Sequence, residues 1–100
     1  MTTALTFSTG QQPDGRAILT VAGEIDMSNA DSFGAALSSA IPGEGTLVVD
    51  LSAVRYLDTA GLAVLFPHAR HVEIVVPQLL APVVAISGLG DITTVRPAYS

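Results

Sequence analysis

The first part of the chain alternates apolar and polar side chains over short stretches. Residues 5–8 read Leu-Thr-Phe-Ser, a period of two that predicts a β-strand. A turn-forming cluster follows at 10–15, and residues 17–22 form a second largely apolar run. Because only a short turn separates the two runs, we expect them to pair as antiparallel strands.

The next segment changes from a strand pattern to a helix pattern. Residues 23–26 are expected to leave the sheet, and from 29 to 41 apolar residues recur every three to four positions. This spacing predicts an amphipathic helix. Ser28 is the expected N-cap, with Asp31 three residues later in the place of a capping box. The turn residues at 42–45 end the helix.

Two further strands are predicted in the middle of the chain, separated by a helix. Residues 46–51 form an apolar run typical of a strand covered on both sides. Residues 54–57 either add a short strand or lead directly into a helix that begins at Thr59, which Pro67 limits or kinks. Residues 72–76 form the next predicted strand.

The last helix and strand complete an α/β pattern. Pro77 can open a helix that runs to Ile86, although the helix can also begin at Pro82. Residues 87–90 end the helix, and 92–95 form a short final strand. We therefore predict one domain over residues 1–100, with a mixed sheet of four to five strands.

Composition excludes several classes of function. The chain has 100 residues, 49% of them hydrophobic and only 13% charged, and its net charge is −5. Its four cationic residues are arginines spread along the sequence, which disfavours binding to nucleic acid or to an anionic membrane. So few charges suggest that part of the surface rests against another protein. The sequence leaves open whether two copies associate.

The expected location is the cytoplasm. The first residues lack the basic and apolar regions of a signal peptide. No apolar stretch approaches the roughly 20 residues of a membrane span, so we expect no membrane insertion. The chain has no cysteine, which excludes disulfides, thiol catalysis and thiolate-bound metals.

The strongest candidate site is Asp58-Thr59-Ala60-Gly61, where an extended apolar run gives way to a helix. A hydroxyl at this point can cap the free N–H groups of the first turn, and the same groups favour an anion such as a phosphate. Gly61 leaves room for close backbone approach. From the residues alone, a plain N-cap explains the segment as well. Asp50, the other nearby acid, is expected near a strand end.

Other reactive side chains do not form a convincing site. His68 and His71 are three apart, with only Glu73 nearby as a third metal ligand, so solvated polar residues are the better interpretation. Nothing in the spacing supports Thr59 as a catalytic nucleophile. Residues 88–90 follow a helix, whereas a phosphate-binding loop would follow a strand. We expect no enzyme activity, no metal and no cofactor.

Three segments resemble the signatures of the STAS domain family. Residues 47–62 resemble its central strand-to-helix signature, in which an Asp, a hydroxyl residue and a Gly-Leu pair open the second helix. Residues 21–26 resemble its Gly-Glu-Leu-Asp element, and 83–89 resemble its closing helix. The resemblance implies a mixed sheet with helices packed mainly on one face.

The resemblance also implies a function as an anti-sigma factor antagonist, controlling sigma-factor-dependent transcription. In that group the hydroxyl residue after the Asp, here Thr59, is phosphorylated by an anti-sigma factor with protein-kinase activity. The unphosphorylated form binds the anti-sigma factor, and the phosphorylated form releases it. The partner-binding residues that the resemblance implies are Asp26, Asp58, Thr59, Ala60, Gly61 and Leu62.

A second function remains open. A threonine at position 59 is still phosphorylatable, as in stressosome-type relatives, but the Thr-Ala-Gly-Leu sequence at 59–62 also resembles STAS subunits of phospholipid-transport ABC systems. In that interpretation the domain is a constitutive interaction subunit, and Thr59 is not phosphorylated.

Overall fold

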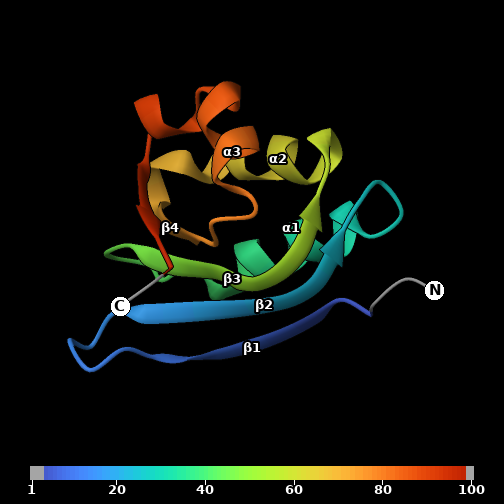
Figure 1. Ribbon diagram of the computed structural model, residues 1–100. Coiled ribbons are helices and arrows are strands. Elements are labelled where there is room, and N and C mark those ends of the chain that lie inside the picture. Colours follow the sequence, from blue (N-terminus) through green and yellow to red (C-terminus); the bar gives the residue numbers. More distant parts are fainter. Residues whose placement is uncertain (1–3, 99–100) are drawn as a thin grey trace.

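The structure is a computed structural model and describes residues 4–98. Five strands and three helices, with two short 3₁₀ helices, follow one another along the chain (Figure 1). In order they are β1 (Thr6–Gln11), β2 (Ala17–Ile25), α1 (Ala30–Ala40), β3 (Leu47–Leu57), α2 (Thr59–Leu65), η1 (Phe66–His71), β4 (Val72–Val76), α3 (Ala81–Ser87), η2 (Leu89–Asp91) and β5 (Thr94–Pro97).

The strands form one mixed sheet in the order β1-β2-β3-β4-β5. Strand β1 is antiparallel to β2, with a continuous register from Thr6 opposite Ala22 to Gln11 opposite Ala17. The pairs β2–β3, β3–β4 and β4–β5 are all parallel. The predicted α/β class, the antiparallel first hairpin and the mixed sheet are therefore confirmed.

The helices lie on one face of the sheet and the hydrophobic core lies between them and the strands (Figure 1). Alternate residues of the central strands point toward the helices because successive side chains in a strand face opposite sides. These residues are Leu19, Val21 and Ile25 of β2, Leu47, Val49 and Leu51 of β3, and Val72, Ile74 and Val76 of β4, and all are buried. Phe33 and Leu37 of α1 and Leu65 of α2 pack against them.

Two strands are longer than their sequence patterns predict. Residues 23–25 stay in β2 instead of leaving the sheet, and Gly23 takes a φ of 111° beside the carbonyl oxygen of Ala4. Strand β3 is continuous from Leu47 to Leu57, so Asp50 lies within a strand and not near its end. The register between β2 and β3 shifts twice, which accommodates the polar break at Ser52 that suggested two separate strands.

The boundaries of the other elements correct or refine the predictions. Ser28 is not an N-cap: Asn29 precedes α1, and it makes no side-chain cap hydrogen bond. Helix α3 begins at Ala81, next to Pro82, which selects the later of the two predicted starts. The last strand lies two residues further along than predicted, because η2 occupies Leu89–Asp91 after the left-handed turn at Gly88. Within residues 4–98, no helix is long and apolar enough to cross a membrane.

Candidate functional site at the start of helix α2

The candidate site lies where β2 and β3 end side by side. Ile25 pairs with Leu57 at the ends of these parallel strands, and the Asp58 N–H donates to the Ile25 carbonyl oxygen at 3.2 Å. Asp26 and Asp58 are the next residues of the two strands. The structure thus brings the two predicted acidic residues, Asp26 and Asp58, to the same end of neighbouring strands.

Asp58 is the N-cap of α2. Its Oδ1 accepts hydrogen bonds from the backbone N–H groups of Ala60 at 2.9 Å and Gly61 at 3.1 Å. A carboxylate at this position satisfies donors that have no partner within the helix. The cap predicted here was a hydroxyl, but the aspartate takes that role because its side chain reaches the second and third helical residues.

Thr59 is consequently the first residue of the helix, and its side chain is exposed. Among the described residues, no hydrogen bond holds its hydroxyl. The N–H groups of the next two residues, Ala60 and Gly61, are already bound by Asp58. A hydroxyl in this position is open to an approaching molecule, while the Asp58 carboxylate occupies two of the backbone donors of the first turn.

Gly61 and Leu62 are buried under this surface. A Cβ atom added to Gly61 would lie 2.5 Å from Leu57 Cδ1 and 2.7 Å from Ile25 Cγ2. The absence of a side chain is therefore what lets the first turn of α2 sit directly on the ends of β2 and β3. The sequence predicted a close approach at Gly61, and the closest neighbours are core side chains rather than backbone.

A network of short-range hydrogen bonds shapes the loop between β2 and α1. The Asp26 carboxylate accepts from both the backbone N–H and the hydroxyl of Ser28, and these bonds lower its pKa. Asn29 accepts from the Asp26 N–H at 2.9 Å and donates to the Glu24 carbonyl oxygen at 2.8 Å. The loop is therefore held in one conformation beside the start of α2.

Two residues of this region escaped the sequence analysis. The helical spacing predicts Asn29 only as the first helical position, yet its side chain cross-links the loop. Met27 is 82% exposed on that loop, although a methionine carries no charge or polar group that would favour water. A long apolar residue in the turn between a predicted strand and a predicted helix is the sequence feature that could have marked Met27 as a contact residue. No sequence pattern marks the cross-link.

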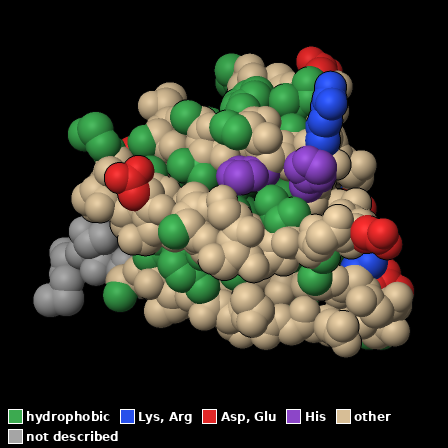
Figure 2. All heavy atoms as spheres, turned by 180° about the vertical axis from the view of Figure 1, so that it is seen from behind, with side chains coloured by type: hydrophobic (Ala, Val, Ile, Leu, Met, Phe, Trp, Pro, Cys, Tyr) green, Lys and Arg blue, Asp and Glu red, His purple; other side chains and the backbone are tan. Residues whose placement is uncertain are grey.

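The structure does not bring Glu73 to the two histidines as a third ligand. His68 and His71 lie in η1, on the face shown in Figure 2, where most surface atoms are uncharged. Glu73, once considered as their third ligand, points to the other face of the sheet and pairs with Arg16 and Arg96. Residues 4–98 contain no cluster of three or more His, Cys, Asp or Glu side chains suited to a metal ion.

Solved structures that share this fold include two anti-sigma factor antagonists. The crystal structure of an anti-sigma factor antagonist from Mycobacterium paratuberculosis matches with a TM-score of 0.84 and 25% identity, over 95% of this chain and 87% of that chain. The structure of the anti-sigma factor antagonist SpoIIAA in its unphosphorylated form matches with a TM-score of 0.71 and 18% identity, over 95% and 90%. The chain therefore has the fold of anti-sigma factor antagonists.

The sequence also identifies the family. The profile of the family described as "Mlab, STAS domain" matches residues 8–95, which is most of the chain. The protein belongs to the STAS domain family. No curated protein sequence matches it.

Proposed function

We propose that the protein is an anti-sigma factor antagonist that binds an anti-sigma factor of the serine/threonine-kinase type through the start of α2. Phosphorylation of Thr59 then ends the complex. The observation that carries the proposal is the exposed Thr59 hydroxyl at the first position of a helix that Asp58 caps. The similarity to an anti-sigma factor antagonist at 25% identity over nearly the whole chain supports the same role.

The contact surface in this proposal consists of the two acidic strand ends and the first turn of α2. Asp26, Asp58, Thr59 and Ala60 are at least partly accessible, and Met27 adds an apolar contact. Gly61 and Leu62 are buried and act by holding the turn in place. In this proposal the site needs no cofactor and performs no reaction of its own. It binds the anti-sigma factor and is also the substrate that this kinase phosphorylates.

Electrostatics explain why a phosphate would release the partner. A phosphate adds about −1.5 to −2 charges. At Thr59 it would stand beside Asp58, whose carboxylate already holds the nearby N–H donors, in a chain of net charge −5. The added charge is therefore not neutralised within the domain. Because Thr59 is exposed, the fold tolerates the group, while a partner surface packed against the bare hydroxyl does not.

The test is a kinase assay with the cognate anti-sigma factor and ATP, followed by a binding measurement. We expect one phosphate per chain, lost in Thr59→Ala and kept in Thr59→Ser. The control is Thr94→Ala, which removes an exposed threonine at a distant strand. Phosphorylation, or Thr59→Asp, should weaken the complex at least about tenfold. Labelling that persists in Thr59→Ala contradicts the proposal.

A constitutive interaction subunit, as in an ABC phospholipid-transport or stressosome-like complex, is the second candidate. It is favoured by the same cap, since Asp58 already occupies the Ala60 and Gly61 N–H groups that could otherwise help to hold a phosphate. Pull-downs from the native host, with ATP and with phosphatase, separate the two functions. A stable partner whose binding ignores both treatments supports the second candidate, and a partner released by ATP supports the first.

A further inference from the structure

The two edges of the sheet are protected to different degrees. Strand β5 has four residues and carries Arg96 and Pro97, and both short length and such residues discourage pairing with another strand. Strand β1 has six residues, no charge and no proline, and its register with β2 is unbroken. The β5 edge therefore discourages pairing with a further strand, whereas the β1 edge has no such feature.

The outer side of β1 is accessible along its whole length. All six of its residues are exposed, including Phe7 at 37%. Figure 1 shows β1 as the outermost strand, with no other labelled element beyond it. In an antiparallel pair, every second residue directs its N–H and C=O away from the partner strand. Such groups on β1 form a row of donors and acceptors that face outward.

Charge indicates what can pair with this edge. β1 is the one strand of the sheet without a charged residue, since Glu24, Asp50, Glu73 and Arg96 mark the other four. Two copies of a chain with a net charge of −5 repel each other in most orientations. Approach along β1 places no like charges directly opposite each other, which in a sheet would be destabilising.

We propose that a second copy of this chain pairs with β1 in antiparallel orientation and extends the sheet across a twofold axis. The axis is perpendicular to the sheet, so the helices of both copies lie on the same side. The candidate site at the ends of β2 and β3 is not on this edge, and the pairing is independent of the proposed function. With one strand from each copy as the contact, the association is weak and concentration-dependent.

A charge introduced at the centre of β1 tests the pairing. Analytical ultracentrifugation over a concentration series should show a monomer–dimer equilibrium, strengthened by salt because salt screens the repulsion between the acidic copies. Ser8→Lys should weaken the dimer at least about tenfold, by setting two lysines close together. Thr94→Lys adds the same charge to the other edge and should leave the dimer unchanged. Circular dichroism confirms that both variants fold.

A cross-link fixes the geometry. The chain has no cysteine, so single Ser8→Cys and Thr9→Cys variants report only contacts between copies. Opposed residues in an antiparallel pair have Cα atoms about 4.5–5.5 Å apart, within the reach of a disulfide. Mild oxidation should therefore give a covalent dimer for at least one of them and none for Thr94→Cys. A monomer at every concentration, or equal cross-linking of all three variants, overturns the proposal and leaves β1 as an edge for another protein's strand or for none.

Discussion

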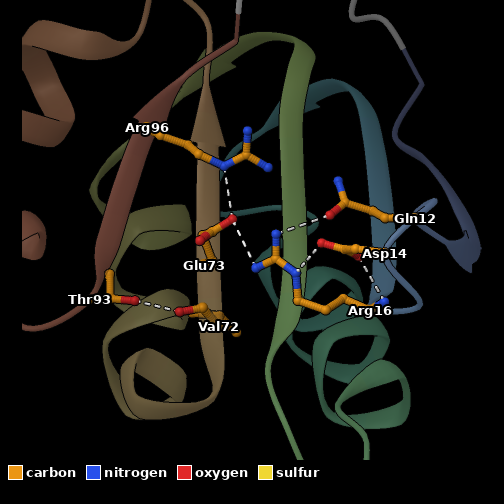
Figure 3. Close-up of polar contacts among 7 residues, drawn as sticks. All are labelled: Gln12, Asp14, Arg16, Val72, Glu73, Thr93 and Arg96. Carbon is orange, nitrogen blue, oxygen red and sulfur yellow. Dashed lines mark hydrogen bonds and ion pairs between the residues drawn. The ribbon is translucent and has the colours of Figure 1, made fainter.

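The two faces of the sheet are stabilised in different ways. On the helix-covered face, apolar side chains of three helices pack against the strands, and no polar or charged residue of the described chain is buried there. On the helix-free face, Glu73 of β4 joins Arg16, before β2, to Arg96 of β5 (Figure 3). Arg16 also bonds Asp14 and Gln12 of the first turn.

This difference shows how a sheet with helices on only one face shields the apolar side chains of its other face from water. Val48 of β3 pairs with Ile18 of β2 and with Glu73 of β4, and it is fully buried although it does not face the helices. The ion pair between Arg16, before β2, and Glu73 spans β3, the strand that carries Val48. An arginine side chain that crosses a strand in this way can shield apolar surface with its stem while its charge reaches a carboxylate such as Glu73. One face depends on volume and shape, and the other on charge.

The largest expected effect is on the helix-covered face. Phe33 of α1 is 0% exposed at the centre of the core. Phe33→Ala should lower the free energy of unfolding by about 3–5 kcal/mol, because it removes buried apolar surface and leaves a cavity. Urea unfolding measures the change. Ser32→Ala, an exposed neighbour on the same helix, is the control and should change stability by less than about 0.5 kcal/mol. A small effect at Phe33 would show that the core repacks readily.

The second prediction concerns the packing under the candidate site. Gly61→Ala should destabilise the fold by about 2 kcal/mol, since the new Cβ overlaps the buried Leu57 and Ile25 side chains. Gly34→Ala in α1 is the matched control: its Cβ would meet Val64 Cγ1 at an ordinary 3.5 Å. There the better helix propensity of alanine should raise stability by up to about 1 kcal/mol. Equal effects of the two substitutions in thermal unfolding would contradict the close packing at Gly61.

The helix-covered face is also the part of the molecule that the sequence predicts best. The apolar run at 17–22 and the helical spacing over 29–41 are local patterns, and both elements appear within three residues of their predicted bounds. The start of α2 at Thr59 was predicted for the same reason, because Asp58, Thr59 and Gly61 mark a helix start. The choice of Asp58 over a hydroxyl as the cap depends on backbone dihedrals that residue types alone leave open.

The helix-free face could not be predicted, since its contacts join distant parts of the chain. Arg16 and Glu73 are 57 positions apart, and nothing in their neighbourhoods pairs them. The continuity of β3 was missed for a related reason. Ser52 and Ala53 look like a break, but the partner strand absorbs them through a register shift. Both features require knowledge of which strands are neighbours.

The third prediction separates the two roles of Asp58, as a cap and as a charge. Asp58→Ala removes the acceptor for the Ala60 and Gly61 N–H groups and should cost about 1 kcal/mol of stability. Asp58→Asn keeps an oxygen that can cap the helix and should cost only a few tenths. If the charge of Asp58 takes part in the proposed partner contact, binding falls in both variants while stability falls in one. Equal stability of the two variants, measured by urea unfolding, contradicts the capping role.

The smallest effect belongs to the helix-free face and depends on pH. Arg96 and Arg16 both bond the Glu73 carboxylate and lower its pKa. A carboxyl whose pKa is lower in the folded state contributes stability above its unfolded pKa of about 4.3, and that contribution is lost as the pH falls through the folded pKa. Glu73→Gln should therefore lower the free energy of unfolding by about 0.5–1 kcal/mol near neutral pH. The effect is this small because Glu73 is 16% exposed and its arginine partners are partly solvated.

Below the unfolded pKa the difference between wild type and Glu73→Gln should shrink, because the carboxyl becomes neutral in both folded and unfolded wild-type chains. Urea midpoints at a series of pH values from neutral to about pH 3 measure this convergence. The variant keeps part of the acid sensitivity, since Asp14 and Asp26 also have lowered pKa values from bonds to Arg16 and Ser28. A difference that stays constant down to the lowest pH would mean that Glu73 acts through packing, and that the two faces of the sheet are stabilised by the same means.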